Sequence, residues 1–340
     1  MSNIASYFQV KSKTLQKHYK HQVSGYHEWE QKHHAEDYLI FPENITDSIS
    51  IDEVSLSKGE LYTIVTNKNT NCKNKKSVIA IINGTDAKTI EDVLLKLPLE
   101  SRNRVKEISL DMAPNMALAS RNCFVKSSLV IDRFHVVRLV CDAMQHLRTQ
   151  LRWKVIDDEN EAIKKAKEQG LKYKAELLSN GDTLRELLVR SKYLLYKYEN
   201  DWTLNQKKRA DILFAKYLQL KQAYDLCNGF RNIYKCALKQ QAIEKFIDWK
   251  NKVQEVNIKE FNSVVNSIEN HFDNIMNFFD NRITNANAEC FNSKIKNFRA
   301  NLRGVTDTFF ATTLIVKLIS FIINQIYYLV ENNFSKFTRL

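Results

Sequence analysis

Glycine and proline are scarce in this sequence. Its 340 residues contain 7 Gly and 3 Pro, and the prolines, Pro42, Pro98 and Pro114, all fall in the first third. Glycine alone averages about 7% of residues, and these two residue types build most tight turns. The composition therefore excludes a turn-rich, all-strand architecture after Pro114. It predicts a helix-rich chain of one or two domains with few connections.

Closely spaced cysteines and long apolar runs are also missing. The six cysteines include no C-x-x-C pair, which argues against a disulfide framework and a cysteine zinc site. The most apolar stretch, residues 309–329, is interrupted by Lys317, Asn324 and Gln325, and the chain opens without an apolar signal core. We therefore expect a reduced, intracellular protein with no membrane partner.

Positive charge is what the sequence has in excess. It carries 51 Lys and Arg against 39 Asp and Glu, a formal net charge of +12. A polyanion is the leading class of partner, but charge alone does not separate DNA from RNA or from an acidic membrane surface. No phosphate-binding loop, G-x-S-x-G or H-E-x-x-H motif accompanies the charge.

Between residues 48 and 137 the apolar pattern predicts an alternation of strands and helices. Three strands come first, followed by a helix, a strand, a helix, a strand and the start of another helix. The expected bounds of the first seven elements are 48–56, 60–67, 77–83, 85–96, 105–110, 114–123 and 128–131. This βββαβαβα order describes an α/β fold with a mixed sheet, and it is the order of the ribonuclease H-like fold.

The remaining segments are predicted to be helical. Thr183 with Glu186, and Thr203 with Gln206, have the spacing of capping boxes, which mark helix starts. Two short apolar rhythms near the N-terminus fit the back half of a helix-turn-helix, and an amphipathic helical hairpin fits equally well. The expected organisation is a partial helix-turn-helix-like segment, a linker, the first part of the core, a large helical insertion and the C-terminal part of the core, at 1–26, 27–47, 48–135, 136–281 and 282–340.

Three aspartates lie in or beside the predicted strands. Asp52 lies inside a strand, whereas Asp111 and Asp132 each close one. A carboxylate at a strand's end can simply stabilise the next helix N-terminus, so this interpretation stays open for the latter two. In a ribonuclease H-like sheet the first and fourth strands are neighbours, which places Asp52 beside Asp111. A divalent cation, Mg²⁺ or Mn²⁺, is the simplest compensation for two such charges.

Two further segments carry candidate functional residues. Between residues 282 and 304 five basic side chains accompany a single acid, Glu289, which shares a helix face with Lys296 and Arg303. Such a face suits a metal-and-phosphate surface, although an ordinary solvated helix is the alternative. His135 follows Asp132 in a D-x-x-H element, where it is suited to bind a metal, contact a phosphate or cap a turn.

Several stretches resemble the DDE transposases of bacterial insertion sequences, in particular the L-three family and its branch common in Bacteroidetes. They are HYKHQVSGYHEWEQKHHAEDYLIFPENI, ISIDEVSLSKGELYTIVTNK, VKEISLDMAPNM, VIDRFHVVRLVCDA and FDNRITNANAECFNSKIKNFRANLRGV. The resemblance implies a ribonuclease H-like catalytic core whose acidic triad is Asp52, Asp111 and Glu289. Asp132 and His135 correspond to an auxiliary motif, and a rival alignment makes Asp132 the second triad member.

The resemblance also implies an activity, a cofactor and partners. The activity is DNA strand cleavage and strand transfer with two Mg²⁺ or Mn²⁺ ions held by the triad, acting on the element's terminal inverted repeats and on target DNA. A homodimer or synaptic oligomer and a nucleoid-associated, cytoplasmic location are expected. Relatives commonly carry a zinc finger ahead of the core, which this sequence lacks, so a separately encoded N-region polypeptide is an expected partner. The expected DNA contacts are Lys13, Lys17, Lys294, Lys296, Arg299 and Arg303.

Three alternatives remain open at the level of sequence. The first is a catalytically inactive transposase remnant that only binds DNA, against which the presence of all three acids weighs. The second is a structure-selective nuclease on the same core. The third is a helical scaffold that uses its charge to bind RNA or membranes, which the strand aspartates make the least favoured.

Overall fold

The computed structural model describes residues 2–7, 9–18, 29–55, 61–68 and 78–282, together with residues 293, 296 and 297. Contacts divide the chain into two compact units, one formed by residues 1–127 and 285–340 and the other by residues 128–284.

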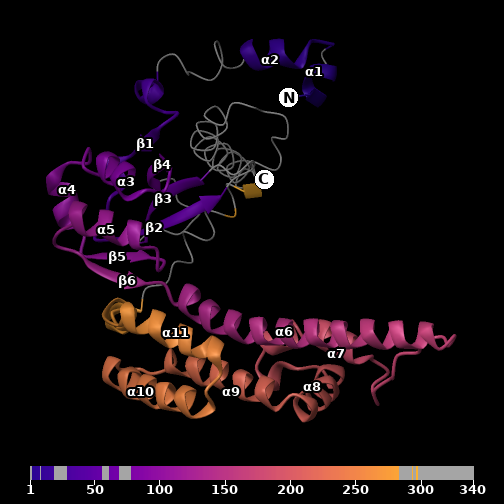
Figure 1. Cartoon of the computed structure of the whole chain (residues 1–340). Helices are drawn as coiled ribbons and strands as arrows, with labels where there is room; N and C mark the ends of the chain where they lie inside the picture. Colours follow the sequence, from indigo (N-terminus) through magenta and orange to yellow (C-terminus); the bar gives the residue numbers. More distant parts are fainter. Residues whose placement is uncertain are drawn as a thin grey trace, which may run out of the picture. The chain divides into compact units, whose positions relative to one another are not determined.

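A six-stranded mixed sheet is the central feature of the α/β part of the chain (Figure 1). Its strand order is β1-β4-β3-β2-β5-β6. The pairs β1/β4, β4/β3 and β3/β2 are antiparallel, whereas β2 and β5 run parallel. The strands are β1 (Tyr38–Ile40), β2 (Ser48–Ser55), β3 (Leu61–Asn67), β4 (Val78–Asn83), β5 (Glu107–Leu110) and β6 (Ser128–Ile131).

Strands β2 to β6 were predicted from the sequence and begin and end within about two residues of the expected bounds. Strand β1 was not predicted, because the sequence analysis assigned it to the expected linker 27–47. Three residues are too few to show an alternating pattern. A side chain helps to fix this strand: the Gln31 amide accepts a hydrogen bond from Ile40 N (2.9 Å) and donates one to Ile40 O (2.8 Å).

The two faces of the sheet differ in polarity. Alternation along β2 places Ile49 and Ile51 on one face, where they are fully buried, and Ser48, Ser50 and Asp52 on the other. Near β1, this second face is apolar as well. A core cluster there contains Ala35, Leu39, Val54, Tyr62, Ile64, Val78 and Ile81, with Trp29 and Phe41 packed against it.

Three helices follow the first strands. They are α3 (Ala87–Leu94), α4 (Leu99–Arg104) and α5 (Pro114–Cys123). Helix α5 has the predicted bounds, whereas α4 was not predicted. Helices α3 and α5 pack on each other, and they contact β4 and β5 respectively. The side chain of Asp86 caps α3 by accepting a hydrogen bond from Thr89 N (2.9 Å). Pro114, whose missing N–H costs nothing at a helix start, opens α5.

At the N-terminus the structure contains two short helices, α1 (Ser2–Tyr7) and α2 (Ser12–His18), which pack on each other. The chain turns between them at Gln9, whose φ of 52° lies in the left-handed region. Val10 N donates a hydrogen bond to Ala5 O (2.8 Å) across this turn. The remainder of the expected helix-turn-helix-like segment, residues 19–26, lies outside the described residues.

The second unit is helical apart from β6. Helix α6 (Arg133–Glu168) begins one residue after Asp132 and continues without a break past the expected boundary at residues 135 and 136. The other helices are α7 (Leu184–Arg190), α8 (Leu204–Lys216), α9 (Leu218–Ile233), α10 (Lys239–Val256), α11 (Lys259–Asn270), α12 (Phe272–Met276) and α13 (Phe278–Asn281). No helix of the described residues is long and apolar enough to cross a membrane.

Both predicted capping boxes are present in this unit. Thr183 Oγ1 accepts a hydrogen bond from Glu186 N (3.3 Å), and Glu186 Oε2 accepts one from Thr183 N (2.9 Å). Thr203 and Gln206 make the same reciprocal pair at the start of α8. These starts were predictable because each box satisfies backbone donors that only a helix N-terminus leaves unpaired.

A buried ion-pair network holds α7 and α8 together. Asp182, whose side chain is 2% exposed, accepts a hydrogen bond from Arg209 Nε (2.8 Å) and forms an ion pair with Arg190. Burial alone would raise the pKa of Asp182, but the hydrogen bonds and charges of Arg209 and Arg190 outweigh it and hold the pKa below its usual value. The ionised carboxylate of Asp182 therefore stabilises the folded state.

We expect Asp182→Asn to lower the free energy of unfolding of the full chain by about 3 kcal/mol at pH 7, because it leaves two arginines without their buried partner. Because the pKa of Asp182 is depressed, its contribution is present above pH of about 4 and is lost as the pH falls through the folded-state pKa. The difference between variant and wild type should therefore shrink below that pH. Urea denaturation measures both effects, and Asp211→Asn, at an exposed position of α8, is the matched control.

Candidate active site

The parallel pairing of β2 with β5 brings two of the predicted acids together. Ser48 is opposite Glu107, and Ser50 is opposite Ser109. Continuing this register by two residues places Asp52 opposite Asp111. Side chains two residues apart on a strand share a face, and neighbouring strands lie about 4.8 Å apart. Extended in this way, the register puts Asp52 and Asp111, both half-buried, at adjacent positions just past the last residue pair of β2 and β5.

Backbone groups hold each of these carboxylates. Asp52 Oδ1 accepts a hydrogen bond from Glu53 N (2.9 Å) within β2. Asp111 immediately follows β5, and its Oδ1 accepts one from Ala113 N (2.8 Å) in the turn that leads into α5. The alternative interpretation of Asp111 was a cap of the following helix. The N-cap residue of α5 is Ala113, so Asp111 does not cap the helix directly. Its side chain stabilises only the turn before the helix.

Two carboxylates at adjacent positions repel each other unless a cation or a proton compensates. Carboxylate oxygens are the preferred ligands of Mg²⁺ and Mn²⁺. A half-buried position also suits such a site, because the charges are partly shielded from water while a substrate can still reach them. The two carboxylates therefore fit a divalent cation. Among the described residues they are not joined by a third potential ligand.

Polar side chains continue along the same face beneath the two acids. Ser48, Ser50, Thr66 and Ser109 are buried, and their hydroxyl oxygens have no hydrogen-bond partner within the part of the chain that the structure describes. A buried ion pair between Lys68 and Glu107 (3.5 Å) lies at the far end. An unsatisfied buried hydroxyl costs about 1–3 kcal/mol, so this polar strip is expensive for the fold. Sequence analysis missed it, although alternate Ser-x-Ser-x-Asp and Glu-x-Ser-x-Asp patterns precede both acids.

Asp132 and His135 lie at the start of the helical unit. Asp132 occupies the N-cap position of α6, but its side chain makes no capping hydrogen bond to that helix. It is only 5% exposed. His135 is half-buried one turn later, where its ring contacts Phe134 edge-to-face at 5.8 Å. Capping therefore does not explain the buried carboxylate of Asp132.

A buried tyrosine lies within electrostatic reach of Asp132. Tyr234 packs against Phe230, Phe278 and Phe279, and its hydroxyl has no hydrogen-bond partner among the described residues. Burial raises the pKa of this phenol well above its usual value, and the negative charge of Asp132 adds to the effect. The neutral phenol is therefore the form that the folded state favours.

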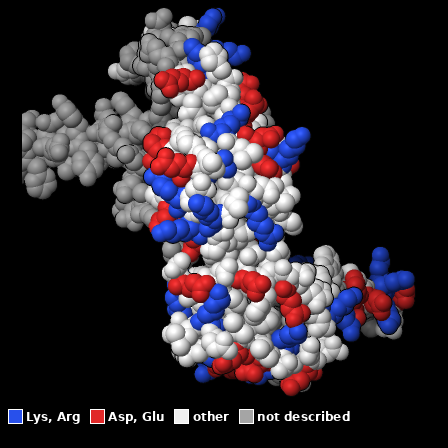
Figure 2. Space-filling view, turned by 90° about the vertical axis from the view of Figure 1, so that its left-hand side faces the viewer, with Lys and Arg blue, Asp and Glu red and all other residues white. Residues whose placement is uncertain are grey.

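The predicted basic and acidic residues near the C-terminus are only partly described. Glu289, Lys294, Arg299 and Arg303 lie outside the described residues, whereas Lys296 is an exposed helical residue. At the other end, Lys13 and Lys17 are exposed on α2. On the face in Figure 2, positive and negative side chains of the described residues are interspersed, without a large basic patch.

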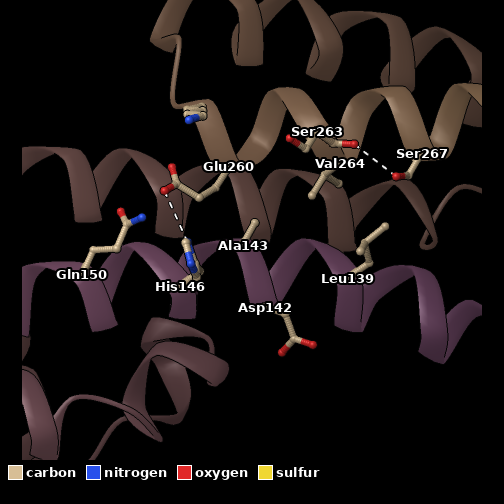
Figure 3. Close-up of a pocket in the computed structure, with 10 residues that line it drawn as sticks. Leu139, Asp142, Ala143, His146, Gln150, Glu260, Ser263, Val264 and Ser267 are labelled. Atoms are coloured by element: carbon tan, nitrogen blue, oxygen red, sulfur yellow. Dashed lines mark hydrogen bonds and ion pairs between the residues drawn. The ribbon is translucent and has the colours of Figure 1, made fainter.

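In the helical unit, a groove of about 490 Å³ lies between α6 and α11 (Figure 3). His146 Nδ1 and Glu260 Oε1 lie 3.4 Å apart across it and form an ion pair when the histidine is protonated. Small side chains, Ala143 and Ser263 among them, leave the space between the helices. Both carboxylates of its lining already have basic partners, Arg138 for Asp142 and His146 for Glu260. The acids of the sheet are therefore the better candidate for metal-dependent chemistry.

The comparisons with known proteins give the family of the chain. Residues 49–313 match a family model, DDE_Tnp_ISL3, that is described as a transposase. Transposases act on DNA, which they cut and transfer. Because the match spans well over half of the chain, the protein belongs to the ISL3 family of DDE transposases. No curated protein sequence and no solved structure matches the chain.

We expect Tyr234→Phe to raise the free energy of unfolding by about 1 kcal/mol at pH 7, because it removes a buried hydroxyl that lacks a partner. With the folded-state pKa raised, wild type loses stability as the pH rises above about 10, where the unfolded-state phenol ionises. The variant should lose less over that range. Denaturation at pH 7 and pH 10.5 tests both points, and a loss of more than 1 kcal/mol at pH 7 would show that the hydroxyl is hydrogen-bonded.

Proposed function

We propose that this transposase cleaves and transfers DNA strands by phosphoryl transfer that depends on two divalent ions, Mg²⁺ or Mn²⁺. Asp52, Asp111 and Glu289 are the proposed ligands and catalytic triad, on a core that we assign to the ribonuclease H-like fold. The observation that supports the proposal is the parallel pairing of β2 with β5, whose register, continued by two residues, would place Asp52 opposite Asp111. The expected βββαβαβα order is present from β2 to α6 with one additional short helix, α4, before β5, and it supports the fold assignment.

The donor set supports the metal assignment. When bound, the ions would activate the attacking oxygen and stabilise the leaving oxygen of an in-line displacement. The chain's own contribution is to fix two carboxylates on a rigid sheet, where a backbone N–H holds one oxygen of each. Glu289 is proposed as the third ligand from its place within the family match.

The strand order supports Asp111 over Asp132 as the second member of the triad. Strand β5, which Asp111 follows, pairs directly with β2, whereas Asp132 follows β6, one position further in the sheet order. We propose an auxiliary role for Asp132 and His135. The burial of Asp132 without a capping bond supports a role beyond starting α6.

Contacts to the DNA backbone are assigned to basic side chains. Lys13, Lys17 and Lys296 are exposed and can pair with phosphates, which would make DNA affinity salt-dependent. Lys294, Arg299 and Arg303 are proposed to act alongside Lys296. Action on two element ends also implies a homodimer or synaptic oligomer, and a separate N-region polypeptide is proposed to contribute to end recognition. These two proposals rest on analogy with the family.

The test is cleavage of a DNA that carries the element's terminal inverted repeats, in the presence of Mg²⁺. We expect Asp52→Asn, Asp111→Asn and Glu289→Gln each to reduce cleavage at least about 100-fold, because each removes a charged metal ligand. Glu53→Gln is the matched control, since Glu53 neighbours Asp52 in the same strand but is exposed on the opposite face. It should retain activity.

Undiminished cleavage by Asp52→Asn would refute the mechanism. Full activity of Asp111→Asn together with loss in Asp132→Asn would instead move the second triad position to Asp132. Strand-transfer products separate a transposase from a structure-selective nuclease, which would release cut ends without joining them. Specific DNA binding without cleavage by the wild type would identify an inactive remnant.

A further inference from the structure

Two neighbouring rows of side chains on the polar face of the sheet contain the paired acids and the residues next to them. Asp52 and Asp111 form the first row, by continuation of the β2/β5 register. The second row contains Ser50, with Thr66 opposite it on β3 and Ser109 opposite it on β5. Successive rows are two residues apart along the strands, which is about 6.6 Å. The second row therefore lies on the same face as the paired acids, next to them along the strands.

All three side chains of the second row are hydroxyls in a deeply buried position. Their exposed fractions are 1% for Ser50, 2% for Thr66 and 1% for Ser109. None of the three oxygens has a hydrogen-bond partner among the residues that the structure describes. Buried polar groups in folded proteins are nearly always satisfied, by protein or by ordered water. Three neighbouring exceptions next to two carboxylates call for a shared explanation.

The spacing of this row suits bound water. Neighbouring strands lie about 4.8 Å apart, and a water that accepts or donates two hydrogen bonds of about 2.8 Å bridges groups at that separation. Buried waters typically make about three hydrogen bonds. A water held by Ser50 and one neighbouring hydroxyl thus has a further bond to give. The charged acceptors two residues away on that face are Asp52 and Asp111 on one side and Glu107, which already pairs with Lys68, on the other.

We propose that Ser50, Thr66 and Ser109 form a positioning layer that holds ordered water beneath Asp52 and Asp111 and so orients both carboxylates toward a divalent cation. The proposal rests on the proposed function and extends it. These hydroxyls touch neither the DNA nor the ion; they act through the acids. Outer-shell groups of this kind set the orientation and basicity of metal ligands. The layer also gives a reason for keeping costly polar groups in an otherwise apolar sheet.

The experiment is a titration of the full chain with Mn²⁺ alone, followed by calorimetry or by the electron paramagnetic resonance of free Mn²⁺. We expect Ser50→Ala/Ser109→Ala, and separately the nearly isosteric Thr66→Val, to weaken Mn²⁺ affinity by about 10-fold or more. The urea midpoint should change little, because the hydroxyls that are removed have no hydrogen-bond partner among the described residues of the protein. Ser50→Thr, which keeps the hydroxyl, should retain more affinity than Ser50→Ala.

Ser120→Ala is the matched control. Ser120 is also a fully buried serine with no hydroxyl partner among the described residues, but it lies on α5, away from the polar strip. Its substitution should leave Mn²⁺ affinity unchanged. Thr66→Val provides the test if the double variant fails to fold.

Two outcomes separate this inference from the proposed function. If Asp52→Asn loses Mn²⁺ binding while the hydroxyl variants bind as tightly as wild type, the positioning layer is refuted and the metal site stands. If Asp52→Asn itself binds Mn²⁺ like wild type, the metal assignment fails and the layer fails with it. An equal loss of affinity in Ser120→Ala would also overturn the inference, because the effect would then be a general one.

Discussion

The parallel pairing of β2 with β5 is the constraint on which the candidate site depends. These strands are separated by more than fifty residues of sequence, and only their register decides whether Asp52 and Asp111 meet. A slip of one residue would move one acid to the opposite face of the sheet. The register is fixed by the apolar residues of the other face, since Ile49, Ile51, Ile108 and Leu110 are all fully buried. The packing of these apolar residues thereby determines which face of the sheet carries Asp52 and Asp111.

The same sheet shows how polarity is distributed to serve a site. One face carries the buried apolar residues Ile49, Ile51, Ile108 and Leu110, whereas the other is apolar near β1 and polar next to Asp52 and Asp111. A protein selected for stability alone would fill the polar positions with valine or isoleucine, because buried hydroxyls and a buried Lys68–Glu107 pair contribute little or cost free energy. Their presence next to two carboxylates is the pattern expected where function sets the residue type.

Most of this fold was predictable from local patterns. Strands β2 to β6 follow apolar alternation and runs, α5 starts at Pro114, and both capping boxes mark the helix starts they predicted. The pairing of β2 with β5, from which we infer that Asp52 and Asp111 are close, required a fold hypothesis as well, because sequence spacing does not reveal register. Strand β1 escaped prediction because three residues show no period and because β4 and the Gln31 side chain stabilise it. The polar strip has a readable pattern, but its burial follows from tertiary structure alone. Glu289 and the basic residues around it stay predictions, as does the Bacteroidetes branch.

The central claim, that Asp52 and Asp111 share a cation, has a direct measurement. Crystals of the full chain soaked in Mn²⁺ would locate the ion by its anomalous scattering. The account predicts a peak about 2.1–2.2 Å from a carboxylate oxygen of each of the two aspartates, slightly beyond the distance typical of Mg²⁺. A peak at Asp132 without Asp52 would contradict it. The absence of any peak between Asp52 and Asp111 at saturating Mn²⁺, with the two carboxylates turned away from each other, would also contradict it.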